Sequence, residues 1–408
     1  MLNPTLNIVA VPGLRFPFRS SFSRSSSGLY VNKLGILQSS SSDLRDNYDP
    51  TTGAYKGWLL ESSRTNLLLY SQAIDTPNWT LARVVCTVNA ATAPDNTTTA
   101  CLVTDANDGT SGKHNPRQNV TTDITLPHTA SIWMKRPASN ATQYAFIYMY
   151  DAANPLVNST VSVFDLVNET VISTNSIGAT VSSNAEIQKY PNGWYRLITS
   201  VSTYAASGTL ARTDFGFTTS TDPNFIGTGV ECMYMWGAQL ERASSASSYI
   251  ATTSTATTRS NDNVPIDDVD WFNTREGTFY TRVIYNELSE GLCTFSISDG
   301  TDNNRIMLRQ AGSPHTQRLT SVVSSVVSPD LTISGTLATG TEYRIAASYA
   351  NNDFAGCVNG GTVYTTASGA IPSGLNSASL SLPSNHNLLQ FAYFPERLTN
   401  AELQRLTA

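Results

Sequence analysis

Residues 48–79 read YDPTTGAYKGWLLESSRTNLLLYSQAIDTPNW, and this stretch contains two apolar runs joined by a short polar segment. It begins with a turn, because Pro50 fixes φ and Gly53 readily adopts a positive φ. The polar segment places Glu61 and Arg64 three residues apart between two strand-like runs. We expect these two side chains to form an ion pair that fixes a corner of a sheet. A charged binding groove is the functional alternative.

Segments with alternating apolar and polar residues follow at regular spacing between residues 48 and 262. Five of them are ASIWMK at 130–135, QYAFIYMY at 143–150, VSVFDL at 161–166, YRLITSV at 195–201 and ECMYMW at 231–236. This period of two, with no helical periodicity between the segments, predicts an antiparallel β-sandwich whose inward faces carry the alternate aromatic residues.

The sequence loses its apolar periodicity at residues 251–270, where we expect a domain boundary. Alternating segments resume at 276–285, 293–300, 304–309, 343–349 and 354–361, and predict a second antiparallel sandwich. Thr399 and Glu402 form a capping-box pattern, which predicts a short helix from about residue 400. The predicted fold is therefore all-β: an extended N-terminal arm at 1–47, one sandwich at 48–262, a second at 263–408, and a short C-terminal helix.

Composition excludes several classes of function. The 408 residues carry a net charge of −6 and only 14% charged side chains, whereas a nucleic-acid-binding protein needs a basic surface. No apolar run reaches the ~18 residues of a membrane-spanning helix, so membrane insertion is not expected. Five cysteines occur without a C-x-x-C pair or a nearby histidine, so zinc is not expected.

The opening stretch also carries a resemblance. Its pattern Y-D-P-x-T-G-x-x-x-G-x-L-x-E-x-x-R-T-N-L-L is similar to a segment of bacteriophage virion proteins, especially tail-fibre and head-decoration proteins. Further matches in the same order are FSRSS at 22–26 with Tyr30 and Gly35, NGWYR at 192–196, WGAQLE at 236–241 and SYI at 248–250. The chain departs from this family at 44–47, LRDN, where a Pro-Arg-Phe step is usual, which puts the local strand pairing in doubt.

Each expected sandwich resembles a known architecture. The strand order at 48–262 resembles the jelly rolls of carbohydrate-binding modules. Residues 265–408 resemble a concanavalin A-like, laminin-G-type sandwich, through the VNG element at 358–360 and the ending LQFAYFPERLTNAEL at 389–403.

The resemblance to virion proteins implies a function. It implies display on the particle surface, in a tail fibre, spike or head decoration, and attachment to host cell-surface polysaccharide. It also implies a homo-oligomer, usually a trimer, with the arm at 1–47 docked on other capsid or tail proteins. Because such a protein folds in a bacterial cytoplasm, we expect Cys86 and Cys101 to remain thiols, although a hairpin could bring them together. The alternatives are a structural cement or decoration protein without a ligand, and a glycan depolymerase.

No enzyme is predicted and no catalytic residue is assigned. Nucleophilic catalysis needs a positioned histidine, but the four histidines, His114, His128, His315 and His386, all lie in polar loop contexts. The E-x-D-x-x-E pattern of many jelly-roll glycanases is absent, although paired carboxylates from distant positions leave glycan hydrolysis open.

Sugar recognition combines aromatic faces with planar polar side chains. The candidates in predicted loops are Trp79, Tyr190, Trp194, Tyr349 and Asn351. A structural role is expected for Glu61, Arg64, Asn66, Trp236, Gln239 and Glu241. No cofactor is expected, and calcium is the single metal considered, at two oxygen-rich segments where plain turns are the favoured interpretation. Their candidate ligands are Asp299, Asp302, Asn303 and Asn304 in one, and Asp267, Asp268 and Asp270 in the other.

Overall fold

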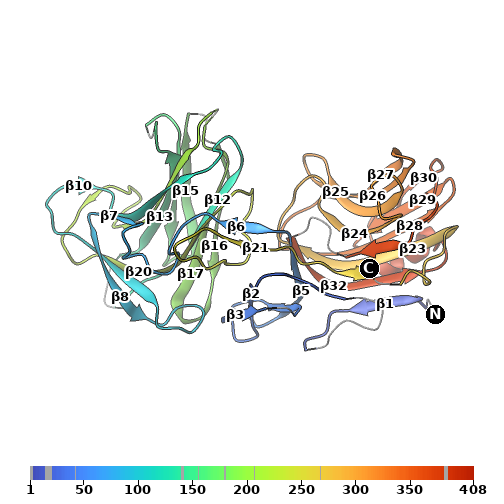
Figure 1. The fold of residues 1–408 in the computed structure, drawn as a ribbon, viewed down its shortest axis with the longest axis horizontal. Coiled ribbons are helices and arrows are strands. Elements are labelled where there is room, and N and C mark those ends of the chain that lie inside the picture. Colours follow the sequence, from blue (N-terminus) through green and yellow to red (C-terminus); the bar gives the residue numbers. More distant parts are fainter. Residues whose placement is uncertain are drawn as a thin grey trace.

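Two β-sandwiches lie side by side in the computed structural model of the chain (Figure 1). The structure describes residues 3–13, 21–41, 43–138, 142–154, 156–178, 181–205, 207–266, 268–380 and 385–408. The predicted all-β fold of antiparallel sandwiches with one short C-terminal helix is confirmed. Among the described residues, no helix is long and apolar enough to cross a membrane.

The N-terminal sandwich consists of two six-stranded sheets. The first has the order β15 (Thr170–Ile177), β14 (Ser159–Asp165), β13 (Tyr144–Asp151), β18 (Leu210–Thr218), β11 (Asn115–Thr121) and β7 (Thr80–Ala82). The second has the order β16 (Val181–Lys189), β17 (Trp194–Thr203), β12 (His128–Lys135), β20 (Cys232–Glu241), β9 (Ala100–Asp105) and β8 (Val84–Ala91). The 3-10 turn η1 (Pro191–Gly193) joins β16 to β17, and the ribbon of β10 (Ser111–Gly112) and β19 (Phe225–Ile226) lies beside this sandwich.

The C-terminal sandwich pairs an eight-stranded sheet with a six-stranded one. The larger sheet has the order β30 (Tyr364–Thr366), β29 (Asp353–Val358), β28 (Glu342–Ala350), β23 (Glu276–Tyr285), β32 (Asn385–Phe394), β5 (Tyr55–Glu61) and β4 (Arg45–Tyr48), with β1 (Leu6–Val9) also paired to β32. The smaller has the order β22 (Pro265–Ile266), β31 (Ser377–Ser379), β24 (Cys293–Ser298), β25 (Arg305–Ala311), β26 (Thr316–Val323) and β27 (Val326–Thr336).

The sheets divide the chain differently from the expected ranges. Strands β1, β4 and β5 pair within the C-terminal sandwich, although residues 1–47 were expected to form a separate arm and β5 to open the first domain. The reason is a long-range pairing in which Leu60 of β5 lies opposite His386 of β32. The chain then crosses to the N-terminal sandwich through β6 (Arg64–Asn66) and returns through β21 (Thr257–Arg259), which pair with each other (Figure 1).

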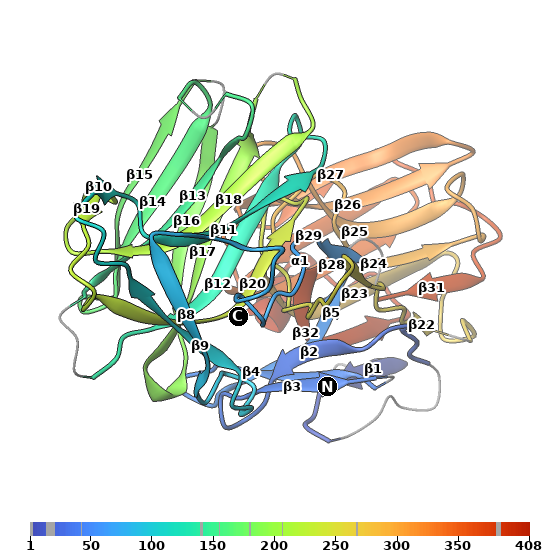
Figure 2. The same ribbon diagram turned by 60° about the vertical axis from the view of Figure 1, so that its left-hand side comes forward.

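Each sandwich has its own apolar core, and a third cluster joins the N-terminal sandwich to a ribbon. This ribbon is formed by β2 (Gly28–Val31) and β3 (Leu37–Ser40), which lie below the sheets in Figure 2. Its Val31 and Leu37 belong to a buried cluster with the three tryptophans Trp133, Trp194 and Trp236. The ribbon therefore covers aromatic side chains on the outer face of the β16–β8 sheet.

The end of the chain follows the sequence prediction. Helix α1 (Asn400–Thr407) begins after Thr399, whose side chain accepts a hydrogen bond from the Glu402 amide, while the Glu402 side chain accepts one from the Thr399 amide. The predicted capping box is confirmed. Buried Leu403 joins an apolar cluster with Phe394 and Leu398, which attaches the helix to the larger sheet.

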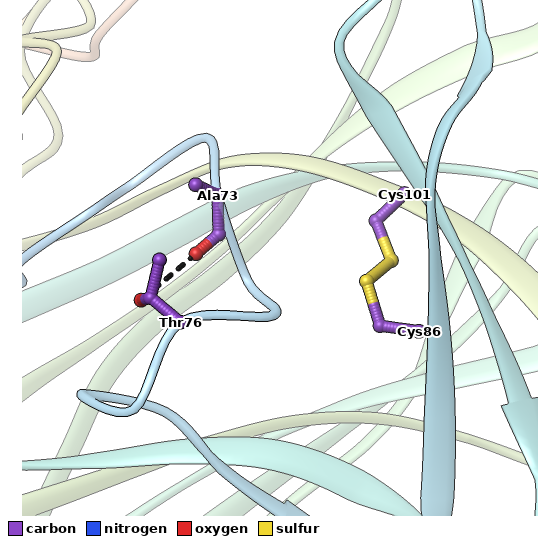
Figure 3. Close-up of a disulfide and its surroundings, with 4 residues drawn as sticks. All are labelled: Ala73, Thr76, Cys86 and Cys101. Atoms are coloured by element: carbon purple, nitrogen blue, oxygen red, sulfur yellow. Dashed lines mark hydrogen bonds between the residues drawn. A yellow bond between two sulfur atoms is a disulfide. The ribbon is translucent and has the colours of Figure 1, made fainter.

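Cys86 and Cys101 form a disulfide between the paired strands β8 and β9, with Cα atoms 6.0 Å apart (Figure 3). The expectation that both would be thiols is therefore corrected. That expectation rested on the cellular compartment implied by the family resemblance, and not on the geometry of the hairpin. The three other cysteines, Cys232, Cys293 and Cys357, are not in disulfides.

We predict that alkylation of the denatured, unreduced protein modifies three cysteines, and that prior reduction raises the number to five. Mass spectrometry of the alkylated chain measures this. Because the bridge closes a loop of 15 residues, Cys86→Ser should lower the free energy of unfolding by about 3 kcal/mol. Reduced wild-type protein should then match the variant. Five modified cysteines without reduction would contradict the pairing.

Candidate functional site

An open groove of about 680 Å³ lies where the two sandwiches meet. Its volume lies within the roughly 300–1,000 Å³ typical of ligand pockets. Polar side chains predominate along it, with tyrosines between them. This combination of rings and hydrogen-bonding groups makes the groove the candidate functional site.

One wall of the groove belongs to the N-terminal sandwich. Strand β16 alternates, so Asn184, Glu186 and Gln188 all lie on the side that lines the groove. The Gln188 amide donates a hydrogen bond to Glu186 at 2.9 Å. These side chains are exposed or half-buried, and they offer amide and carboxylate groups to a ligand.

The opposite wall comes from the start of the chain and from loops of the C-terminal sandwich. Half-buried Tyr30 and Tyr48 line it, and the Tyr48 ring packs against Tyr55 with centroids 5.2 Å apart. The turn after β4 contributes Asp49, whose side chain accepts hydrogen bonds from the Thr51 and Thr52 amides. Two amides of the C-terminal sandwich also line this wall: Asn286, just after β23, and Asn387 of β32, which share a hydrogen bond of 3.0 Å.

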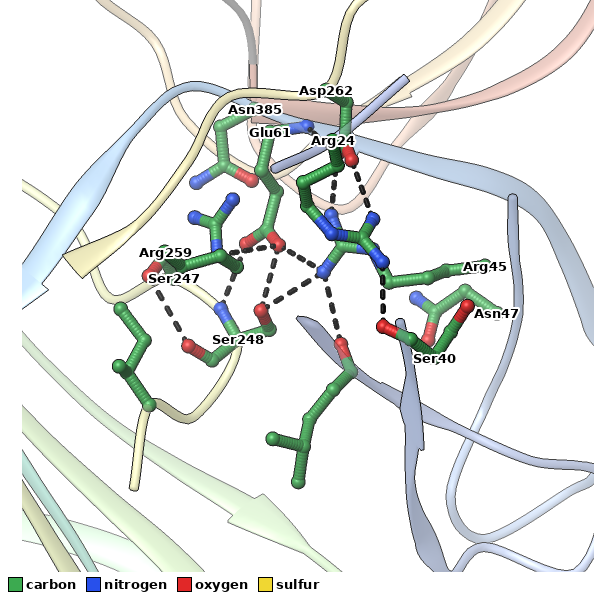
Figure 4. A network of polar contacts seen from close by, with 12 residues as sticks. Arg24, Ser40, Arg45, Asn47, Glu61, Ser247, Ser248, Arg259, Asp262 and Asn385 are labelled. Atoms are coloured by element: carbon green, nitrogen blue, oxygen red, sulfur yellow. Dashed lines mark hydrogen bonds and ion pairs between the residues drawn. The ribbon is translucent and has the colours of Figure 1, made fainter. Parts of the chain in front are cut away.

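Buried ion pairs lie under the groove, and we call these residues the ion cluster: Arg24, Arg45, Glu61, Arg259 and Asp262 (Figure 4). Arg45 is fully buried and donates to Glu61 and to Asp262, each at 2.5 Å. It also donates to the Leu29 carbonyl and the Ser248 hydroxyl. Figure 4 shows Glu61 between Arg45, Arg259 and Ser248.

The charge state of Glu61 follows from these contacts. Burial alone would raise the pKa of its carboxyl, but the guanidinium groups of Arg259 and Arg45 and the hydrogen bonds from Ser248 outweigh burial and lower the pKa to about 2. Ser248 donates both its amide and its hydroxyl at 2.7 Å. Glu61 is therefore ionised in the folded protein at neutral pH.

The expected pair of Glu61 with Arg64 is not formed. Glu61 ends β5 and pairs with Arg45 and Arg259, whereas Arg64 begins β6 and pairs with Glu287 at 2.8 Å. The polar corner between these strands sends the two side chains to different partners. Both pairs nevertheless lie at the junction between the sandwiches, because Glu61 and Glu287 line the groove there.

Four of the five predicted sugar-binding side chains are buried: Trp79, Tyr190, Trp194 and Tyr349. Trp194 is covered by the β2–β3 ribbon, and Tyr349 donates a hydrogen bond to the Asn273 carbonyl inside the C-terminal core. Tyr190 lines the groove but is only 6% exposed. Asn351 is exposed in the turn between β28 and β29 and does not line the groove. The structure therefore does not bring these five residues together.

The remaining motif residues form a hydrogen-bonded network in the N-terminal sandwich. Asn66 donates to the carbonyls of Ala238 and Ile250, and accepts from the Leu68 and Leu240 amides. The side-chain amide of Asn66 thus donates two hydrogen bonds and accepts two, which agrees with the expected structural role.

Glu241 and its neighbours extend that network. Its carboxyl accepts hydrogen bonds from Gln239 and from the amide and hydroxyl of Ser247, although burial raises its pKa. Trp236 donates its ring N–H to Thr99 at 2.9 Å. These side chains hold the strand β20 and the loop that follows it, whose residues 244–249 line the groove.

The calcium candidates take part in turns. Asp299 accepts hydrogen bonds from Thr301 and Asn304, Asp302 pairs with Arg305, and Asn303 accepts from Ser325. In the second segment, Asp268 accepts from the Asp270 amide, and Asp267 lies outside the described residues. Within the described part of the chain, no group of three or more His, Cys, Asp and Glu side chains could hold a metal ion.

Comparisons with known proteins identify no family. The chain matches no protein-family model, and no curated protein is similar to it. Among solved structures, domain 4 of AbnA, a GH43 extracellular arabinanase from Geobacillus stearothermophilus, is 19% identical, with 36% of this chain and 73% of that chain covered and a TM-score of 0.31.

Two further solved structures are similar at a comparable level. Domains LG4-5 of the mouse laminin alpha1 chain are 11% identical, with 68% of this chain and 84% of that chain covered and a TM-score of 0.21. The Trypanosoma rangeli sialidase is 11% identical, with coverages of 76% and 60% and a TM-score of 0.24. Similarity this low carries no argument about function, so the site must be judged by its own chemistry.

Sequence reasoning missed the residues that organise the groove. Arg45 lies in the LRDN segment, which the resemblance marked as a departure, and Asp262 and Arg259 lie in the expected linker. A charged residue between apolar strands was the available signal, but its partners are up to 217 positions away. Pattern analysis of neighbouring residues cannot supply such contacts.

We predict that Glu61→Gln lowers the free energy of unfolding at pH 7 by about 3–5 kcal/mol, because it removes the carboxylate that Arg259 contacts and one of the two that Arg45 binds. Denaturant titration measures the change, and Glu396→Gln, at an exposed glutamate, is the matched control.

The same ion cluster should make the wild-type protein sensitive to acid. The folded pKa of Glu61 is about 2, below its unfolded value, so its contribution to stability is present above about pH 4.5 and is lost as the pH falls towards 2. Unfolding titrations at pH 7, 4.5, 3 and 2 should show this loss in wild-type protein and a smaller one in Glu61→Gln. Equal acid dependence of the two proteins would refute the assignment.

Proposed function

We propose that this protein binds a glycan in the groove between its two sandwiches. The observation that carries the proposal is the groove itself: about 680 Å³ of open concave surface lined by tyrosines and amide side chains. Tyrosine combines an apolar ring with a polar hydroxyl, which suits the faces and edges of a sugar ring. Asparagine and glutamine supply both donors and acceptors to sugar hydroxyls.

The charges in the groove favour an uncharged sugar as ligand. Asp49 is paired with Lys56 at 3.1 Å, Glu287 with Arg64 at 2.8 Å, and Glu61 with Arg45 at 2.5 Å. These three carboxylates therefore have partners before a ligand arrives, whereas Glu186 accepts a hydrogen bond from Gln188 and forms no ion pair with a described cation. Neutral hydroxyl groups can be received by the remaining amides without breaking these pairs.

Binding is favoured over cleavage by the state of two groove carboxylates, Asp49 and Glu61. A glycosidase needs one carboxyl that stays protonated near neutral pH. Hydrogen bonds to Asp49, although burial opposes them, lower the pKa of its carboxyl, and Arg259 and Arg45 do so for Glu61. Both groups are therefore held as carboxylates, which is the wrong state for a general acid.

The resemblance to virion proteins gives the proposal its setting. In this proposal the protein is displayed on a phage particle, in a tail fibre, spike or head decoration, and the ligand is polysaccharide on the host cell. A homo-oligomer, such as a trimer, would multiply the affinity of single grooves. Docking to capsid or tail proteins would use the N-terminal segment outside β1, because β1 is engaged in the larger sheet.

The test is a screen of folded full-length protein against bacterial surface glycans, followed by titration of the best neutral ligand. Tyr48→Ala and Asn184→Ala should each weaken binding about tenfold, which corresponds to about 1.4 kcal/mol of binding free energy. Tyr364→Ala is the matched control, since Tyr364 is 37% exposed and lies outside the groove.

Three other results would redirect the proposal. Loss of binding in Asn351→Ala, with the groove variants unaffected, would move the site to the turn after β28. New reducing ends during incubation with the ligand would establish a depolymerase. If protein shown to be folded binds no glycan of the set, the result would favour a cement or decoration protein without a ligand.

A further inference from the structure

A second surface lies on the N-terminal sandwich, on the outer face of the sheet β15–β14–β13–β18–β11–β7. Core residues Ala145, Ile147 and Met149 point inward from β13, so Tyr148 and Tyr150 lie on the opposite side. Their rings pack together with centroids 4.6 Å apart. We call the surface around these two rings the tyrosine face.

Strand register brings charged residues next to these rings. Tyr148 lies opposite Asp214 of β18, which lies opposite Arg117 of β11, so the three form a row across the sheet. In the next row Tyr150 lies opposite Arg212. Lys113, just before β11, reaches the same place, with its ammonium group 4.7 Å from the centre of the Tyr148 ring.

The cations of the tyrosine face are held mostly by aromatic rings. Lys113 lies over Tyr148, and the Arg212 guanidinium lies 4.8 Å from the centre of the Tyr150 ring. A cation–π contact positions a cation without neutralising it. Arg212 also pairs with Asp214 at 2.9 Å, whereas no described carboxylate lies within ion-pair distance of Lys113 or Arg117.

The face thus keeps positive charge that the protein does not neutralise. Three cations face one carboxylate, Asp214, which is only 3% exposed and already engaged by Arg212. Lys113 and Arg117 are half-buried, so their nitrogens remain within reach of a ligand. Tyr148 is half-buried and Tyr150 is buried, so the cations, with the Tyr148 ring beside them, are the groups offered to a ligand. A cationic sheet surface of this kind is complementary to an extended chain that carries regularly spaced anionic groups.

The class of anion follows from the charge of this surface and of the whole chain. Nucleic acid binding requires a broad basic stripe and a positive protein, but here the charge excess is local and the net charge of the chain is −6. A polysaccharide with one carboxylate per sugar or per repeat presents a lower charge density and many hydroxyl groups. The neighbouring Asn119 and Asn175 are exposed and can form hydrogen bonds with those hydroxyl groups.

We propose that the tyrosine face binds an acidic, uronate-bearing polysaccharide, with Lys113 and Arg117 receiving its carboxylates. This site is separate from the groove and does not depend on the function proposed for it. The groove has paired charges and suits neutral sugar, whereas this face has unpaired cations and suits acidic sugar. One chain could then contact two kinds of residue in a mixed surface glycan.

The experiment is affinity electrophoresis of the full-length protein in native gels that contain polygalacturonate or, for comparison, neutral dextran. Polygalacturonate should retard the wild-type protein. The double variant Lys113→Gln/Arg117→Gln should bind about tenfold more weakly, because it removes both charge-assisted contacts. Binding should also weaken as salt is raised from 0.05 to 0.5 M, since the contacts are at the surface.

The matched control is Lys33→Gln/Arg275→Gln, which removes the same charge from two exposed positions away from both surfaces. It should bind like wild-type protein, as should Tyr48→Ala in the groove. Far-ultraviolet circular dichroism and thermal unfolding of each variant exclude misfolding as the cause.

Four results would overturn the proposal: equal retardation by dextran, equal binding by the Lys113/Arg117 variant, an equal loss in the charge control, or loss of polygalacturonate binding in Tyr48→Ala. The last result would place the acidic polymer in the groove. Tighter binding to duplex DNA than to polygalacturonate, measured in the same buffer, would show that the face is a nucleic-acid surface instead.

Discussion

A buried guanidinium group needs acceptors within the protein, and both terminal nitrogens of Arg45 find them where the two sandwiches meet, although its Nε finds none. Its acceptors come from the β2 strand, the end of β5, the loop after β20 and the segment after β21. These four segments belong to different layers of the structure. The hydrogen bonds of one side chain therefore fix these segments relative to one another. The groove lies between the layers that are held in this way.

The ion cluster also explains why its residues are charged. Hydrophobic side chains of the same volume can stabilise a junction as well as a buried ion pair does, but they are compatible with many relative orientations of the two sandwiches. Three guanidinium groups and two carboxylates joined by directed contacts are compatible with few such orientations. We infer that the cluster specifies the relative orientation of the sandwiches more than it adds to stability. A binding groove formed by two separate bodies depends on such specificity.

Local patterns predicted the elements well, and long-range pairing decided the rest. The segments around 130–135 and 276–285 became β12 and β23, and Thr399 capped a helix, because period-two alternation and capping depend on residues close in sequence. The domain boundary at residue 48 could not be predicted this way, since β5 pairs with β32 more than 300 residues later. Trp194 was expected in a loop, but it is buried in a cluster that joins other aromatic rings to the β2–β3 ribbon. Groove residues such as Asn184 carry no local signal at all.

The two proposed binding surfaces, one between the sandwiches and one on the N-terminal sandwich, would receive different ligands. Each surface uses tyrosines and amides, so composition does not distinguish them. The distinction is whether a cation is paired with a carboxylate, as Arg64 is, or placed on a ring, as Lys113 is. This difference is invisible in a charge count over the chain and appears only when the partners of each side chain are known.

The pairing of β1 and β5 with β32, and of β4 with β5, also has a consequence for how the chain comes to fold. The N-terminal sandwich lies between β6 and β21, so its strands are all available once residue 259 has been synthesised. The C-terminal sandwich, in contrast, begins with residues 6–9 and needs residues 385–394 to close its larger sheet. Contacts of such long separation form slowly. During synthesis β1 and the second edge of β5 must therefore wait for β32 beside an already folded N-terminal sandwich.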